Sequence, residues 1–96
     1  MKLQGQTKTS HVVVEIDDNI ILPNWIKERI ERIYNKLLCN GPSSKENINN
    51  FCRCVLGSIN PFVNKKITFF THYEMGVLHI LFSEETQHTE RGIDNE

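Results

Sequence analysis

Regular patterns of apolar and polar positions divide the chain into predicted elements. Residues 10–16 contain the run HVVVEI, rich in β-branched side chains that suit a strand, and the polar residues 17–19 end it. Apolar residues then repeat at helical spacing from Pro23 to about Asn40, and again over 44–59. Gly41 and Pro42 stand between these runs and favour a helix end. The pattern therefore predicts one strand followed by two amphipathic helices.

A predicted β-hairpin follows the second helix. Residues 65–73 and 76–83 are rich in Phe, Ile, Thr and Val, and the character of their side chains alternates as in a strand. Gly76 can supply the positive φ of a tight turn between them. Side chains of a strand alternate between its two faces, so each run has a stronger and a weaker apolar side. We expect the stronger set to meet the helices: Ile67, Phe69, Tyr73, Leu78, Ile80 and Phe82.

These elements follow the order β-α-α-β-β and predict an α+β fold. Two helices packed on one face of a three-stranded, mainly antiparallel sheet bury every apolar stripe in two layers. We place this single domain at residues 10–83. Residues 1–9 are polar and are expected to form a flexible N-terminus, and residues 84–96 read as an acidic, flexible tail with no apolar periodicity.

The far face of the predicted sheet is not uniformly polar, and it is our candidate protein interface. Two helices can cover only one side, and contiguous apolar surface on a soluble protein often marks an interface. Two other outcomes are a cover formed by the tail or by residues 20–22, and single exposed apolar residues. The expected interface residues are Val13, Phe70, His72, Val77, His79 and Leu81.

The net charge is −1, which gives no overall attraction to nucleic acid or an anionic membrane. Between residues 27 and 66, however, eight basic residues stand against three acidic ones. A nucleic-acid interface is therefore the alternative to a protein interface. Glu28 and Glu31 interrupt the basic row, and the aromatic residue between Arg32 and Lys36, Tyr34, belongs to the apolar stripe of the predicted helix and is not free to stack on bases. The residues of this alternative are Arg29, Arg32, Lys36, Lys65 and Lys66.

Cysteines and histidines are the candidate metal ligands. The cysteines Cys39, Cys52 and Cys54 form an odd set, which favours reduced thiols and a cytoplasmic protein. Residues two apart on a helix point away from each other, so Cys52 and Cys54 would not share an ion. His72 and His79 share one face of the hairpin but need a third ligand, from His11 or a carboxylate such as Glu15. We expect no metal site.

Catalytic motifs are absent from the sequence. It contains no phosphate-binding loop, nucleophile elbow or His-Glu-x-x-His pattern, and the adjacent acids Asp17 and Asp18 are typical of a turn. We expect a small non-enzymatic interaction protein, such as an adaptor, inhibitor or regulatory subunit, that binds a protein partner or a second copy. We expect no cofactor, no small-molecule substrate and no membrane contact.

Overall fold

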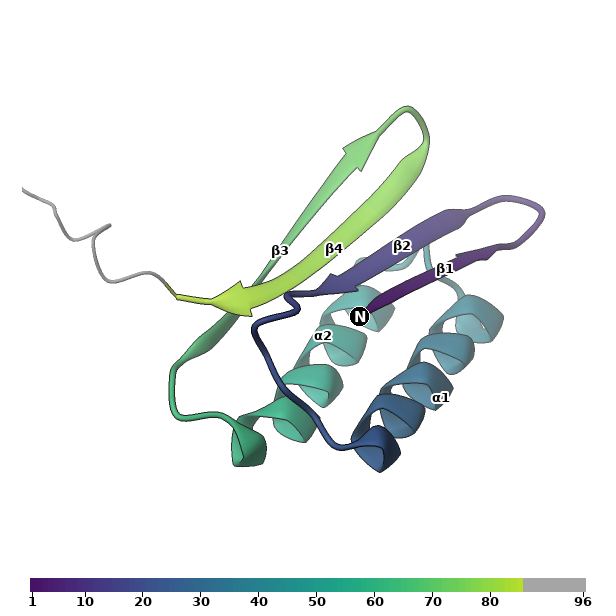
Figure 1. Cartoon of the computed structure of the whole chain (residues 1–96). Coiled ribbons are helices and arrows are strands. Elements are labelled where there is room, and N and C mark those ends of the chain that lie inside the picture. Colours follow the sequence, from purple (N-terminus) through teal and green to yellow (C-terminus); the bar gives the residue numbers. More distant parts are fainter. Residues whose placement is uncertain (86–96) are drawn as a thin grey trace, which may run out of the picture.

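A computed structural model describes residues 1–85. It contains two helices and four strands, joined by short turns and one 3₁₀ segment (Figure 1). In chain order the elements are β1 (Lys2–Gln6), β2 (His11–Ile16), α1 (Asn24–Asn40), α2 (Lys45–Ile59), η1 (Asn60–Phe62), β3 (Ile67–Glu74) and β4 (Val77–Glu84). The fold class is α+β, as the pattern of apolar residues predicted.

The four strands form one mixed sheet in the order β1-β2-β4-β3. β1 with β2, and β3 with β4, are antiparallel hairpins. The two hairpins meet through β2 and β4, which run parallel. Both helices lie on the same face of this sheet, and the other face carries no element of residues 1–85 (Figure 1).

The expectation of a three-stranded, mainly antiparallel sheet is wrong in two respects. Residues 2–6, expected to be flexible, form edge strand β1, and the central pair of strands is parallel. The alternation of apolar and polar residues does not reveal β1. Only Leu3 and Gly5 of this strand face the helices, and glycine has no apolar side chain. At the other end Glu84 is the last residue of β4, and residues 86–96 of the expected tail lie outside the described residues.

The helix ends follow from local chemistry. Gly41 closes α1 in the left-handed region at φ 115°, and its N–H donates to the Leu37 carbonyl. The Ser44 hydroxyl caps α2 by accepting from the Asn47 backbone N–H at 3.2 Å. The Asn47 side chain also donates to the carbonyls of Asn40 and Gly41, at 3.0 and 3.2 Å. These bonds fix the turn between the two helices.

The core lies between the sheet and the helices. Phe82 is fully buried at its centre and contacts the Phe51 ring edge-on, with ring centroids 6.4 Å apart. The Tyr34 hydroxyl donates to the Val12 carbonyl at 2.7 Å, which ties α1 to β2. The sheet contributes Val12, Val14, Ile16, Ile67, Leu78, Ile80 and Phe82, and the helices contribute Ile26, Ile30, Tyr34, Leu37, Ile48, Phe51, Cys52, Val55 and Ile59.

Of the residues expected in this core, Tyr73 lies largely outside it, and Phe69 lies at its margin with its ring 6.0 Å from that of Phe82. Phe69 is 37% exposed and Tyr73 is 64% exposed. They point to the helix side of the sheet, opposite Phe82 and Leu78. The β3–β4 hairpin extends past the helices, so the tip near Tyr73 has no second layer (Figure 1). Phe69 lies farther from the tip, on the edge strand. Alternation predicted the face correctly but not the length of strand that the helices cover.

Candidate protein-binding surface

The open face of the sheet carries all six residues of the expected interface. The strand registers place Phe70 directly opposite Leu81, and His72 opposite His79. His79 is next to Val13 on β2, and Val77 is next to His11. The structure therefore brings Val13, Phe70, His72, Val77, His79 and Leu81 onto one surface, which we call the open face.

The exposed apolar side chains of the open face are concentrated on β3 and β4. Phe70 is 61% exposed and Leu81 is 40% exposed. Val13 is instead buried at 8% exposure, because it lies in an inner strand between Gln4 and His79. Most of the apolar surface available to a partner is thus on the β3–β4 hairpin.

Edge strand β3 is the most exposed strand of the sheet. Only Ile67 of its eight residues is buried. Phe70 is exposed on the open face, while Phe69 and Tyr73 are exposed on the helix side. Proteins usually protect such an edge with lysine, proline, a bulge or a covering segment. The strand ITFFTHYE contains neither lysine nor proline, and its register with β4 is continuous.

A tight turn of two residues forms the tip of this hairpin. Met75 and Gly76 both have positive φ, 54° and 79°, as a type I′ turn requires. The position of Gly76 confirms the expected role of this glycine. Met75 is the one non-glycine residue among 1–85 with positive φ, and its side chain is 95% exposed. The tip thus adds an exposed apolar side chain to the hairpin.

The two histidines of the open face are in direct contact. Their rings stack with centroids 4.8 Å apart and planes 9° from parallel. Phe70 lies beside His72 with ring centroids 5.6 Å apart. The Glu74 carboxylate is 3.8 Å from Nε2 of His72. His11 and Glu15, the expected third ligands, instead lie on β2 opposite Val77 and Leu81.

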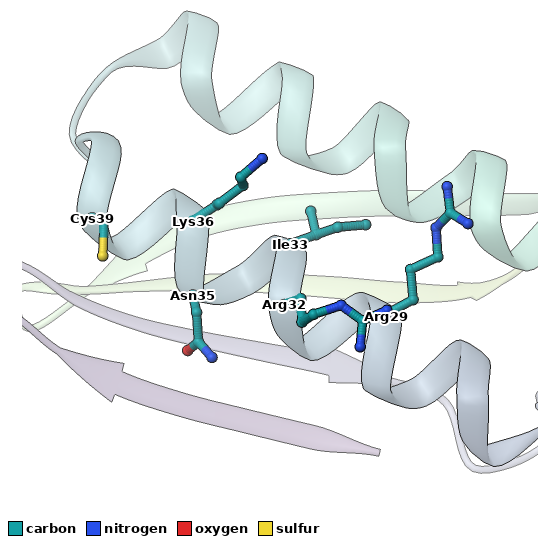
Figure 2. Close-up of a pocket in the computed structure, with 6 residues that line it drawn as sticks. All are labelled: Arg29, Arg32, Ile33, Asn35, Lys36 and Cys39. Atoms are coloured by element: carbon teal, nitrogen blue, oxygen red, sulfur yellow. The ribbon is translucent and has the colours of Figure 1, made fainter.

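The five basic residues of the nucleic-acid alternative lie in two separate places. Arg29, Arg32 and Lys36 line a surface hollow of about 600 Å³ on α1, together with Ile33, Asn35 and Cys39 (Figure 2). Lys65 and Lys66 precede β3, at the sheet edge opposite β1, whereas α1 packs against β1.

The lysines before β3 also face acidic side chains. Lys65 is 4.0 Å from Glu84, and Lys66 is 3.6 Å from Glu85. Acidic neighbours reduce the attraction of these lysines to a phosphate backbone. The five cations therefore do not form one continuous strip.

A second hollow between the helices was missed by sequence reasoning. Trp25 and Phe62 meet edge to face, with ring centroids 5.7 Å apart, and help line a groove of about 640 Å³. Both rings are partly exposed. Trp25 lies off the apolar stripe of α1, and Phe62 lies in η1, which no periodicity predicts. The signal in the sequence was a tryptophan in the first turn of the predicted helix, off its apolar stripe.

The cysteines are free and differ in environment. Cys52 is fully buried in the core, and burial raises the pKa of its thiol to about 12. Cys39 and Cys54 are exposed. The expectation that Cys52 and Cys54 point apart is confirmed, since one faces the core and the other faces solvent.

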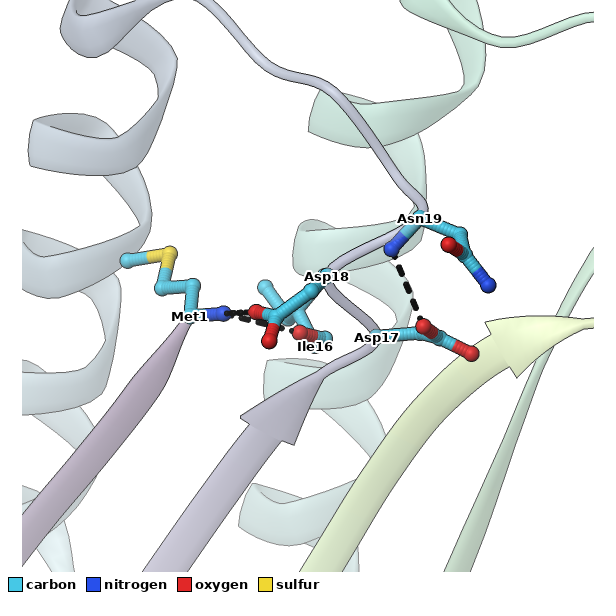
Figure 3. Close-up of polar contacts among 5 residues, drawn as sticks. All are labelled: Met1, Ile16, Asp17, Asp18 and Asn19. Atoms are coloured by element: carbon cyan, nitrogen blue, oxygen red, sulfur yellow. Dashed lines mark hydrogen bonds and ion pairs between the residues drawn. The ribbon is translucent and has the colours of Figure 1, made fainter.

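The adjacent acids Asp17 and Asp18 form a turn, as expected (Figure 3). Asp17 accepts from the Asn19 backbone N–H at 3.0 Å. The Met1 ammonium donates to the Ile16 carbonyl and to Asp18, each at 2.9 Å. The hydrogen bond from this ammonium, with its positive charge, holds the pKa of Asp18 below its ordinary value. Both carboxylates are thus engaged in holding the turn and the start of β1.

Comparison with known proteins gives no relative from which a role could be transferred. No family model matches the chain, and no curated protein or solved structure shows significant similarity to it. The function must therefore be argued from the surface itself.

Across residues 1–85, neither helix has the length and apolar character needed to cross a membrane.

Proposed function

We propose that this protein is a non-enzymatic protein-protein interaction module that forms a homodimer through edge strand β3. The observation that carries the proposal is the exposure of apolar side chains on both faces of an edge strand that, within residues 1–85, pairs only with β4. Such an edge is a template for pairing with another strand. Roles as an adaptor, inhibitor or regulatory subunit would build on this assembly.

A second copy of the chain fits this edge because β3 has opposite charges at its two ends. Lys66 precedes the strand and continues its ladder with β4, since its carbonyl accepts from the Glu85 N–H at 2.8 Å. Glu74 ends the strand. Antiparallel pairing of two β3 strands about a two-fold axis would place Lys66 opposite the partner's Glu74, and opposite charges across a strand pair are favourable.

The same register brings apolar residues together on both faces of the joined sheet. Phe70 would lie on the two-fold axis and meet the partner's Phe70 on the open face. On the helix side, Ile67 would lie opposite the partner's Tyr73. A two-fold axis perpendicular to the sheet places the helices of both copies on the same face of the joined sheet. The helices of each copy would therefore stay over their own strands.

The exposed apolar area on the hairpin is large enough to stabilise a dimer. Burying about 100 Å² of a large side chain contributes about 2.5 kcal/mol at about 25 cal/mol per Å². Association costs about 4–15 kcal/mol in lost freedom of motion. A few such side chains from each copy, together with the backbone hydrogen bonds of a new strand pair, offset that cost.

The test is the molar mass in solution, measured by light scattering after size exclusion at tens of micromolar. We expect about twice the 11.2 kDa chain mass for the wild type. Phe70→Glu should give the monomer mass, because it puts two carboxylates face to face on the axis. Leu81→Glu, which alters the adjoining open face, should weaken the dimer less. Ile21→Glu is the matched control, since Ile21 is an exposed apolar residue outside the hairpin.

Two outcomes would contradict the dimer. One is a wild-type protein that stays monomeric at this concentration. The other is a Phe70→Glu protein that keeps the dimer mass and the wild-type circular dichroism spectrum. Either result would leave the open face for a different protein partner.

Nucleic-acid binding through helix α1 is the weaker alternative. Arg29, Arg32 and Lys36 share a hollow on α1, which supports it. Lys65 and Lys66 lie at the other edge of the sheet beside acidic residues, which counts against it.

A further inference from the structure

Three side chains with metal-ligating atoms meet near the tip of the β3–β4 hairpin. His72 and His79 lie directly opposite each other across the two strands. Glu74 is two residues beyond His72 on the same strand, and therefore on the same face. One ligating atom from each of the three lies within 4.8 Å of the other two.

One of these distances is already close to that of a metal site, and the longest, up to 4.8 Å, must shorten on binding. Imidazole nitrogens and carboxylate oxygens bind Zn²⁺ at about 2.0–2.2 Å, so neighbouring donors in a tetrahedral site are about 3.3 Å apart. The separation of 3.8 Å between His72 and Glu74 needs little change. The remaining adjustment is a side-chain rotation at the surface, because all three residues are at least partly exposed.

The backbone and the neighbouring rings position these ligands. All three residues lie in paired strands, which are more rigid than loops. Phe70 packs beside His72, and Val13 lies next to His79 on β2. These contacts hold the two imidazoles side by side. Each ring nitrogen binds a metal in the plane of its ring, so both exposed rings must turn out of the stack to direct one nitrogen each at a shared ion.

We propose that His72, Glu74 and His79 form a binding site for a divalent transition-metal ion, with Zn²⁺ as the first candidate. Two imidazoles and one carboxylate suit Zn²⁺ and not Ca²⁺ or Mg²⁺, which prefer oxygen ligands. Three protein ligands leave the fourth tetrahedral position to water.

The metal site is independent of the dimer. Its three ligands come from one hairpin of one chain. Glu74 can bind an ion through one carboxylate oxygen and keep the other for the partner's Lys66. Zn²⁺ binding and molar mass are therefore separate measurements, and either can fail alone.

The experiment is calorimetric titration of the full chain with ZnCl₂ at pH 7.5. The background carries Cys39→Ser, Cys54→Ser and His88→Ala, so that competing donors are removed. We expect one Zn²⁺ per chain. His72→Gln and His79→Gln should each weaken binding by at least about tenfold, because each removes a ligand. Glu74→Gln should weaken it less. His11→Gln is the matched control on the same face and should leave the affinity unchanged.

A second readout separates ligation from loss of fold. Co²⁺ in the same site should give the intense visible absorption of a tetrahedral ion, and this absorption should disappear in His72→Gln. Circular dichroism of each variant should match the parent protein. The proposal is overturned by the absence of binding in the background protein, by equal affinity in the His72→Gln/His79→Gln double variant, or by an equal loss in His11→Gln.

Discussion

At the scale of single residues, Cys52 shows how burial changes chemistry. It lies in the core among apolar side chains, with no exposed surface. A thiolate is poorly solvated there, so the pKa of Cys52 rises from its usual 9.0 to about 12. Burial raises the pKa of Tyr34 for the same reason. In both cases the folded protein favours the neutral form.

We expect a thiol reagent to distinguish the three cysteines. Iodoacetamide at pH 8 should modify Cys39 and Cys54 in the native protein, and Cys52 only after unfolding, because the thiolate is the reactive form. Mass spectrometry counts the modified thiols. Rapid modification of all three without denaturant would contradict this assignment.

The same shift in pKa predicts how stability depends on pH. The unfolded thiol ionises first as pH rises, so the contribution of Cys52 is complete below about pH 9 and is lost between pH 9 and about 12. Denaturant titration should therefore show an alkaline decline in the free energy of unfolding. The decline should be shallower in Cys52→Ala, which has no group to ionise at this position.

At the scale of elements, strand β1 depends on a glycine. A Cβ atom on Gly5 would lie 2.5 Å from Cδ1 of Leu38 and 2.6 Å from the Tyr34 hydroxyl. That hydroxyl is held by its hydrogen bond to Val12, so it cannot move freely. Gly5 therefore lets β1 approach α1 closely enough to complete the sheet.

Two glycine substitutions should change stability in opposite directions. Gly5→Ala should lower the free energy of unfolding by about 1–3 kcal/mol, the usual cost of overpacking. Gly57→Ala in α2 should raise it by up to about 1 kcal/mol, because an added Cβ meets nothing within 4 Å and alanine favours a helix. Urea titration of both variants measures the difference. A Gly5→Ala protein as stable as the wild type would show that β1 tolerates a larger separation from α1.

These elements also show what could be predicted from the sequence. β2, α1, α2 and the β3–β4 hairpin each carry enough apolar residues for their own periodicity to show. β1 does not, because its place depends on the space above Tyr34 and Leu38, which exists only after folding. Alternation likewise placed His72 and His79 together. Glu74 was not predicted as a ligand, because the third ligand was expected from His11 or Glu15 and not from the position two residues after His72.

At the scale of the whole molecule, the proposed dimer has a defined register. With Phe70 on the two-fold axis, the two copies of this residue are direct neighbours across a strand pair. The Cα atoms of such neighbours lie about 4.5–5.5 Å apart, within the range of a disulfide. A cysteine at this position should therefore link the two chains.

We expect Phe70→Cys to form a disulfide-linked dimer under mild oxidation. The background should carry Cys39→Ser and Cys54→Ser, and non-reducing electrophoresis separates the linked chains. Gln4→Cys is the control, because it presents an exposed thiol on the same face but at the opposite edge strand, β1. Linkage through Gln4→Cys with none through Phe70→Cys would indicate assembly through the other edge.

The parallel pairing of β2 with β4 has a consequence for synthesis of the chain. β2 can pair with β1 almost as soon as both have emerged from the ribosome, but its other edge matches β4, near the end of the described residues. Both helices and β3 are made in between. We therefore expect a growing chain to carry a valine-rich strand with one open edge until β4 has been made, and this edge can pair wrongly during that time.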